Sequence, residues 1–397
     1  MHVSLLKYPN WTSLGVGQVL IGLVFVSLYF SPALSNLFEF AAFALLATSK
    51  PLRLRLRNFI LSPLAKWYAL FLLALLLGAA NGVIRGNSDL GEMWGWRKVL
   101  LLPLGAVLFI DEEVAKRRLA LGFVVVSILF ALWSNIYFLI GLNPVVAKNY
   151  AVQGMFFSVA VLFCVEFYVS AGSLKVKIAL IFALGLLTLS VFYLTTGRSG
   201  YLAWLVIAPV GVFLASRYGI GIKIFASICF FVVGVGFFLI SSNAKNSVLV
   251  GVNEIKQVDS QQRATRMGDR VIMWQKTVEL LPRYALLGAG LAAFGRAFDE
   301  RWKPGDAVGW QGLSDPHNQY LKIAIELGLP GLLVFLFFIG KTIKASLAEV
   351  GLRRLSVSVL LAWCATSFFS AHFTTFHEGH FIWLFIGVFL FGSKIRS

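Results

Sequence analysis

Long apolar segments recur along the whole chain, and they constrain its fold more than any other feature. An apolar helix of about 20 residues crosses the hydrocarbon core of a bilayer, so 397 residues leave room for about twelve crossings. The expected spans are 13–30, 33–49, 64–83, 97–110, 119–141, 150–171, 176–195, 201–216, 220–241, 319–340, 355–372 and 379–393. The pattern predicts an all-α, polytopic integral membrane protein.

The balance of apolar and charged residues agrees with this class. Hydrophobic residues make up 58% of the chain and charged residues 13%, whereas soluble proteins devote about a quarter of their residues to charge. The net charge of +17 would suggest nucleic acid in a soluble protein. Because cytoplasmic loops of membrane proteins collect Lys and Arg, we expect membrane lipid and no nucleic acid as a partner.

The short loops between the apolar runs give the orientation. Lys and Arg gather in alternate connections: 50–57, 111–118, 172–177, 216–223 and 341–354. The intervening short loops at 31–32, 84–94, 142–149 and 373–379 carry little charge. By the positive-inside rule both termini are cytoplasmic and the number of spans is even. We therefore expect nine spans in 1–241, one large periplasmic loop at 242–318 (the outer segment), and three spans in 319–397.

The outer segment is expected to carry short amphipathic helices. Asp269 is a candidate N-cap, and Pro282 is expected to end or kink the helix that follows. Its apolar stripe would consist of Val271, Trp274, Val278 and Leu281, which suits a helix lying on the bilayer surface. A turn and a second short helix are expected within 288–302.

Two groups of arginines lie on the predicted outer side. Arg198 stands in a tight turn, Thr195–Gly200, whose glycines would let the backbone approach a ligand closely. Arg263, Arg266 and Arg270 would share one face of a helix, and their guanidinium forks suit a phosphate or pyrophosphate. The alternatives are an arginine that snorkels to lipid phosphate and the solvated face of a long loop.

A single histidine stands at the start of the tenth predicted span, within Asp315–Tyr320. Its imidazole titrates near neutrality and can accept a proton from a hydroxyl group. His317 is thus a candidate general base, although a lone histidine is more often structural. Asn318 or Asp315 could orient the ring, and Tyr320 could contact a sugar.

The last outer hairpin is also polar. His372, His377, Glu378 and His380 raise the question of a metal, but their spacing matches no zinc pattern, so we expect none. Polar lining of an outer cavity is the better interpretation for His377 and Glu378. Arg97 and Lys98 could contact a lipid headgroup, or could simply anchor the chain at the interface.

Together these residues predict an outward-facing cationic site next to a histidine. Such a site suits chemistry on an anionic, lipid-linked substrate, and it also suits anion binding by a transporter. A transporter needs a charged path through its helices, and Glu39 and Glu166 are almost the only charges expected inside the spans. This observation disfavours transport.

Three motifs give the chain a family resemblance. His317-Asn318, followed by Gly328 and Gly331, resembles the histidine motif of the O-antigen ligase and polymerase superfamily. Arg198 with Leu202, and Arg270 with Trp274 followed by Gly288-x-Gly290, stand in matching order. The motif region covers about 195–335, and the many-helix topology with one large loop covers the rest.

The resemblance implies a membrane glycosyltransferase of the bacterial inner membrane with a periplasmic active site. The family's ligases move a polysaccharide en bloc from undecaprenyl pyrophosphate to a sugar hydroxyl of lipid A–core, with no metal or cofactor. Arg198 and Arg270, helped by Arg266 and Arg263, would stabilise the pyrophosphate. His317 would be the base of an inverting attack, and Asn318, Tyr320, Asp315, Trp274, Arg97, Lys98, Glu378 and His377 would line the substrate. The polymerase that uses the same donor, a protein-directed oligosaccharyltransferase and a transporter remain alternatives.

Overall fold

The described part of the chain is built from helices. The computed structural model describes residues 12–215, 219–256, 268–300 and 315–392, and no strand occurs within these ranges. The first half comprises α1 (Ser13–Ser27), α2 (Pro32–Thr48), α3 (Lys50–Ile60), α4 (Ala65–Ile84), α5 (Leu90–Trp94), η1 (Gly95–Leu100), α6 (Leu101–Phe109), α7 (Glu113–Leu139), α8 (Tyr150–Ser170) and α9 (Leu174–Leu189). The second half comprises η2 (Ser190–Leu194), α10 (Arg198–Ala215), α11 (Ile220–Ile240), α12 (Ser242–Lys256), α14 (Gly268–Tyr284), α15 (Phe294–Asp299), α16 (Gln319–Leu347), α17 (Leu352–Leu355), α18 (Val357–Thr366), α19 (Phe376–Phe385) and η3 (Ile386–Leu390).

Membrane-spanning length varies among these helices. Within the described ranges, seven are long and apolar enough to cross a bilayer: α4, α7, α8, α9 with η2, α10, α11 and α16. The pair α2 and α3, bent by 94°, would make an eighth. The remaining predicted runs form short helices such as α1, or helices interrupted by 3-10 or π turns such as η1–α6 and α19–η3. The all-α, polytopic class is confirmed.

One predicted cytoplasmic connection is a helix. The basic stretch 50–57 forms most of α3, and Arg55 pairs with Glu112 at 3.1 Å. Glu112 belongs to the next predicted cytoplasmic connection, 111–118. The ion pair therefore brings both connections to the same side of the molecule, as alternation of the loops requires.

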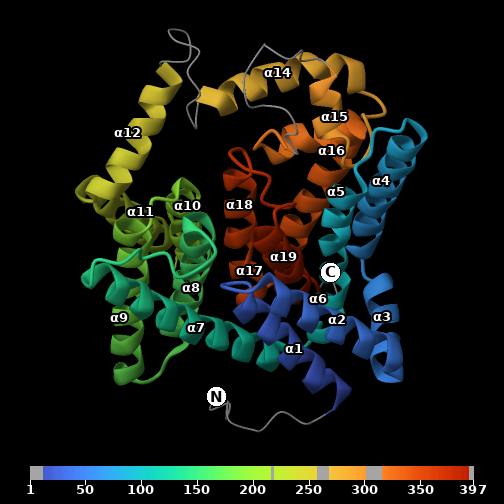
Figure 1. The fold of residues 1–397 in the computed structure, drawn as a ribbon. Helices are drawn as coiled ribbons and strands as arrows, with labels where there is room; N and C mark the ends of the chain where they lie inside the picture. The colour runs from blue at the N-terminus through green and yellow to red at the C-terminus, as the bar shows by residue number, and fades with distance from the viewer. Residues whose placement is uncertain (1–11, 216–218, 257–267, 301–314, 393–397) are drawn as a thin grey trace.

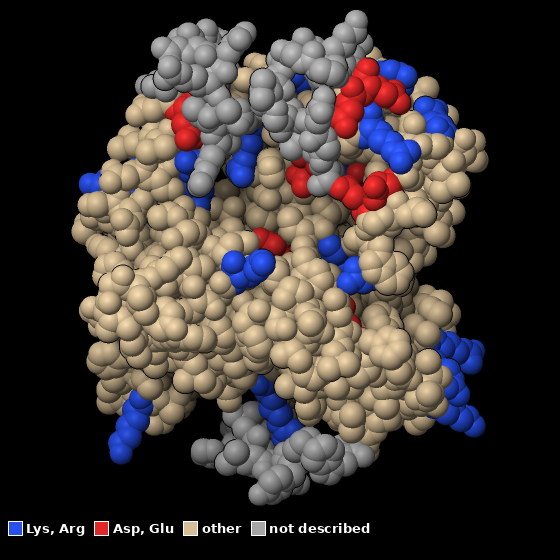
Figure 2. Space-filling view, viewed as in Figure 1, with Lys and Arg blue, Asp and Glu red and all other residues tan. Residues whose placement is uncertain are grey.

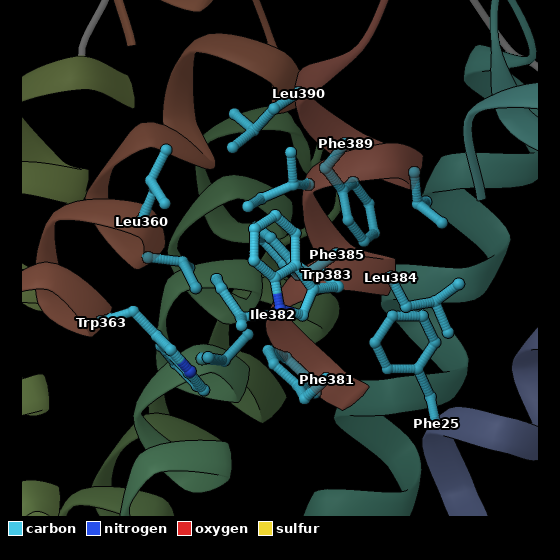
Figure 3. Packing of buried hydrophobic residues seen from close by; sticks show 14 of the residues in the cluster. Phe25, Leu360, Trp363, Phe381, Ile382, Trp383, Leu384, Phe385, Phe389 and Leu390 are labelled. Carbon is cyan, nitrogen blue, oxygen red and sulfur yellow. The ribbon is translucent and has the colours of Figure 1, made fainter. Parts of the chain in front are cut away.

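The core lies where the C-terminal helices pass between the two halves of the bundle. In Figure 1 the red helices α17–α19 stand between the green helices α8–α11 and the blue helices α2–α4. Phe381, Phe385 and Phe389 recur on one face of α19 and η3 and pack with Phe25 and Trp363 (Figure 3). Helix α8 is almost wholly buried, whereas α11 is almost wholly exposed and forms the edge of the bundle.

The outer segment is hydrogen-bonded to the spans through its backbone. Helix α16 is interrupted at Gly328, whose φ is 73°. The loop after α14 pairs with this break: the N–H of Ala289 donates to the carbonyl of Ile325 at 2.7 Å, and the N–H of Leu329 donates to the carbonyl of Ala285 at 2.7 Å. The N–H of Leu291 also donates to the carbonyl of Gly78 in α4, at 2.8 Å. We call residues 285–291 with the break at 328 the glycine interlock.

The glycines of the interlock leave no room for a side chain. A Cβ atom on Gly288 would lie 2.2 Å from the carbonyl oxygen of Glu326, and one on Gly290 would lie 2.2 Å from the Cα atom of Gly82. Both glycines also have positive φ, which other residues adopt only with strain. Close backbone contact and positive φ thus explain why glycine occupies the positions of the Gly288-x-Gly290 and Gly328 motifs.

Helix α14 differs in detail from its prediction. It begins at Gly268, before Asp269, and it continues past Pro282 to Tyr284. The buried residues are Met273, Thr277, Leu280 and Tyr284, whereas Val278 of the predicted stripe is 51% exposed. These residues pack with Phe294 and Phe298 of α15 and with Ile325 of α16, so one side of α14 lies on protein, and contact of the helix with the bilayer surface stays a prediction. The second short helix, α15, is found as predicted.

Replacement of Gly288 by alanine tests the interlock. We expect G288A to lower the thermal stability of the detergent-solubilised protein, because backbone strain alone costs about 1–3 kcal/mol and the new Cβ meets a carbonyl oxygen. The matched control is G340A in α16, where a Cβ would meet nothing within 4 Å. Equal melting temperatures for G288A and G340A would contradict this account.

Candidate functional site

The turn that carries Arg198 is held by close contact with α8. A Cβ on Gly197 would lie 2.8 Å from the carbonyl of Tyr150, and one on Gly200 would lie 2.8 Å from the Cα atom of Gly154. These glycines were expected to let a ligand approach the backbone; instead they let two helices cross closely. Arg198 therefore begins α10 from a rigid base.

Helix α12 fixes the direction of the Arg198 side chain. Its Nε donates to the carbonyl of Ser247 at 2.9 Å, and the Ser247 hydroxyl donates to the carbonyl of Thr196 at 2.9 Å. A Cβ on Gly251 would meet the guanidinium group at 2.7 Å. The first helix of the outer segment, α12, thus fixes the position of the Arg198 side chain.

Arg270 approaches the same region from α14. Its Nη1 donates to the carbonyl of Phe369 at 3.1 Å. Burial and the positive charge of Arg198 lower the pKa of the Arg270 guanidinium, while the carboxylates of Asp315 and Glu254 act in the opposite direction. The two arginines are therefore close enough to repel each other.

Two other predicted arginines, Arg263 and Arg266, lie outside the described residues, so their predicted role stays a prediction. Among the residues that are described, neither Arg198 nor Arg270 forms an ion pair with a carboxylate within 4.0 Å. Two neighbouring guanidinium groups that form no ion pair with a carboxylate of the described residues attract a polyvalent anion.

His317 stands in a constrained turn before α16. Its φ is 51°, and its backbone N–H donates to Oδ1 of Asp315 at 2.6 Å. The same oxygen lies 3.5 Å from the imidazole Nδ1, and the indole N–H of Trp274 donates to the carbonyl of Pro316 at 2.9 Å. Burial lowers the pKa of His317, Asp315 raises it, and Arg270 lowers it. Burial and Arg270 therefore favour the neutral form of the imidazole.

The residues after His317 position the helix. Oδ1 of Asn318 accepts the N–H groups of Tyr320 and Leu321 and so caps α16. The hydroxyl of Tyr320 donates to the carbonyl of Cys364 at 2.7 Å. Both contacts have a structural role, and contact of these side chains with substrate stays a prediction.

Lys98 and Arg97 lie on η1 and have different surroundings. Lys98 is 3% exposed, and its ammonium group donates to the carbonyls of Thr374 and Thr375. Arg97 donates to Oδ1 of Asn36 at 2.8 Å and stacks over the ring of Trp94. Lys98 therefore holds the start of α19, whereas Arg97 has the surroundings of an interfacial anchor.

The histidines of the last hairpin point to different partners. His372 contacts Ser199 and Glu378, while Nε2 of His380 lies 3.5 Å from a carboxylate oxygen of Glu39. His377 and Glu378 are buried at the start of α19. In the described ranges, no three His, Cys, Asp or Glu side chains form a cluster that could hold a metal ion.

Sequence reasoning missed two features here. It gave no role to Ser199, and it considered His372 as a metal ligand or as polar lining of an outer cavity, because nothing in the spacing signals a contact across 173 positions. It also expected almost no charge inside the spans besides Glu39 and Glu166. That expectation is wrong, since α16 buries Lys322 and Glu326, and Nζ of Lys322 lies 3.6 Å from Oε1 of Glu326.

Charge is unevenly distributed over the molecular surface. On the face shown in Figure 2, acidic and basic side chains of the described residues mix in the upper half, beneath α14. The lower end displays Lys and Arg, and broad uncharged flanks lie between the two ends. Arg198, Arg270 and His317 come from α10, α14 and the turn before α16, so three separate elements form one site that can bind an anion and accept a proton.

A family model matches part of the chain. Residues 180–336 match a family model described as O-Antigen ligase. No curated protein matches the chain. The matched region includes Arg198, Arg270, His317 and the glycine interlock. Residues 180–336, which carry all three motifs, are therefore similar to the O-antigen ligase family.

Proposed function

We propose that the protein is an O-antigen ligase that transfers a polysaccharide en bloc from undecaprenyl pyrophosphate to a sugar hydroxyl of lipid A–core. The observation that carries the proposal is the convergence of Arg198, Arg270 and His317 inside the region matched by the family. A pair of arginines suits the pyrophosphate, and a neutral imidazole suits the acceptor hydroxyl. Membrane-spanning helices suit the polyprenyl chain.

The reaction follows from these groups. The acceptor hydroxyl oxygen attacks the anomeric carbon of the donor, and its proton passes to the neutral imidazole of His317. The bond between that carbon and the pyrophosphate oxygen breaks, and the electron pair leaves with the pyrophosphate. A single direct displacement inverts the anomeric centre. The proton on His317 then returns to solvent or to the released pyrophosphate.

The arginines act on the leaving group. Negative charge grows on the bridging oxygen as its bond to carbon breaks, and fixed donors stabilise that charge most in a site with little water. Arg198 is fixed by α12 and Arg270 by the carbonyl of Phe369. The proposed mechanism therefore assigns the whole leaving-group charge to protein side chains and includes no metal or cofactor.

We place the site on the periplasmic face of the bacterial inner membrane. Alternation of basic loops supports this side for the outer segment. The Lys and Arg side chains at the lower end in Figure 2, opposite α14, also support it. Lipid-linked donor and lipid A–core would then reach the site from the same leaflet.

One reconstitution separates this function from its alternatives. The purified full-length protein is incubated in micelles with lipid-linked polysaccharide and lipid A–core. We expect polysaccharide on core, seen as a ladder shifted to lipopolysaccharide mobility. Growth of the lipid-linked chain would instead identify a polymerase. Neither product in micelles, together with movement of donor across the bilayer when the protein is reconstituted in vesicles, would identify a transporter.

Replacement of His317 tests the general base. We expect H317A to lower kcat by about 10²–10⁴-fold, the usual contribution of a positioned base, while binding of undecaprenyl pyrophosphate is unchanged. Single-turnover transfer and ligand binding are measured on the same preparation. Wild-type turnover by H317A would remove the general-base assignment.

The charge of Asp315 gives a pH prediction. The base works when neutral, so activity falls as the pH drops through the pKa of His317, which burial already lowers. Asp315 raises this pKa, and D315N removes its charge while an oxygen still accepts the His317 N–H. We expect the acid limb of the kcat profile to move to lower pH in D315N. A shift to higher pH would contradict the assignment.

Arginine replacements test the pyrophosphate site. We expect R270A to lower kcat/KM for the donor by about 10–100-fold, the value of a hydrogen bond to a charged group, and R270K to recover little because Lys lacks the planar fork. The matched control is R283A on the same helix, whose side chain is 62% exposed. Donor kinetics in R270A equal to those in R283A would move the pyrophosphate site elsewhere.

A further inference from the structure

A chain of three polar side chains lies directly behind Arg198. Ser199, in the first turn of α10, has its Oγ 3.3 Å from Nε2 of His372. Nδ1 of the same imidazole lies 3.8 Å from a carboxylate oxygen of Glu378 at the start of α19. The chain joins two helices that the sequence separates widely.

The burial of this chain is asymmetric. The side chains of His372 and Glu378 are 2% and 7% exposed, whereas Ser199 is only half-buried. Nδ1 of His372 has no hydrogen-bond partner in the described parts of the protein. A buried imidazole that faces only a serine and a carboxylate is costly, so its position calls for a role beyond packing.

The accessible end of the chain lies beside the arginine pair. Ser199 follows Arg198 at the N-terminus of α10, where the N–H groups of Gly200 and Tyr201 donate to the carbonyl of Gly197. The positive end of the dipole of α10, the Arg198 guanidinium and the Ser199 hydroxyl therefore lie within one turn of the helix. Arg270 and Asp315 also act electrostatically on His372. The region is suited to a phosphate oxygen.

We propose that Ser199 is a further donor to the pyrophosphate of the lipid-linked substrate, and that His372 and Glu378 are positioning residues that turn its hydroxyl hydrogen toward that anion. The inference rests on the proposed function and assigns one more contact of the same site. In this arrangement Nε2–H of His372 donates to Oγ of Ser199. The serine then keeps its own hydrogen for the substrate.

The role of Glu378 follows from the two ring nitrogens of His372. A neutral imidazole has one N–H, and with that hydrogen on Nδ1 the ring would accept the serine hydrogen and withdraw it from the substrate. A hydrogen shared between Nδ1 and the carboxylate of Glu378, whose oxygen lies 3.8 Å away, would complete this chain and leave Nε2–H for Ser199.

The test measures binding of undecaprenyl pyrophosphate to the full-length protein in micelles, with undecaprenol as the ligand without phosphate. We expect S199A to weaken binding of undecaprenyl pyrophosphate about tenfold, as for a lost hydrogen bond to an anion. Binding of undecaprenol should be unchanged. H372A and E378A should weaken binding of the pyrophosphate as much as S199A does. Combining either of them with S199A should cause no further loss, because all three side chains act through one hydroxyl.

Conservative variants separate positioning from packing. The amide of H372Q can donate to Ser199, and the amide of E378Q can donate to Nδ1 and fix the hydrogen on Nε2. The affinity of each of these variants for undecaprenyl pyrophosphate should fall less than about threefold, whereas that of the alanine variants should fall about tenfold. S170A in α8, whose hydroxyl contacts only its own helix, is the control for insertion.

The outcomes are distinguishable from failure of the proposed function. Weak binding by R270A together with normal binding by S199A would overturn only this inference. Normal binding by both would overturn the pyrophosphate site itself. Should the buried variants be misfolded, S199A still decides, because its side chain is half-buried and small. Additive losses in S199A/H372A would also overturn the inference.

Discussion

The backbone pairing between the loop after α14 and the break in α16 is the contact on which the site depends. Gly328 interrupts α16. On either side of the break, the carbonyl of Ile325 accepts the N–H of Ala289, and the N–H of Leu329 donates to the carbonyl of Ala285. His317 precedes this short first part of α16, and Arg270 belongs to the helix that leads into the loop. One interlock therefore fixes the ends of both elements, and the Trp274–Pro316 hydrogen bond sets their separation. Without this pairing, arginine and histidine would lie on independent segments.

The link between α18 and α19, residues 367–375, connects this arrangement to the bundle. The carbonyl of Phe369 accepts a hydrogen bond from Arg270, His372 contacts Ser199, and the carbonyls of Thr374 and Thr375 bind Lys98. The N–H of Phe373 also donates to Gln319 at the start of α16. Helices from both halves of the molecule thus meet at one link. A small displacement of this link would change the arginine pair and the first turn of α10 together, so the site behaves as one unit.

The sequence predicts the class and the principal residues of the site because these depend on local signals. Apolar runs specify helices, and Arg198, Arg270 and His317 stand out as polar residues beside them. Other features depend on tertiary contacts that no local pattern encodes. The side of α14 that is buried faces Phe294, Phe298 and Ile325, which lie on other elements. Gly197 and Gly200 are needed for a neighbouring helix, and the pairing of Ser199 with His372 joins a residue of the matched region to one that lies beyond it in the sequence.

The electrostatics of the site give a final argument for an anionic substrate. Two partly buried guanidinium groups near each other raise the free energy of the protein, and within the described residues the nearest carboxylates moderate this charge without forming an ion pair. Burial also favours the neutral form of the neighbouring His317. A bound pyrophosphate would reverse both effects, because its negative charge offsets the guanidinium groups and favours a proton on the imidazole. The same anion that positions the donor would thereby strengthen the base that activates the acceptor, which couples substrate binding to proton transfer.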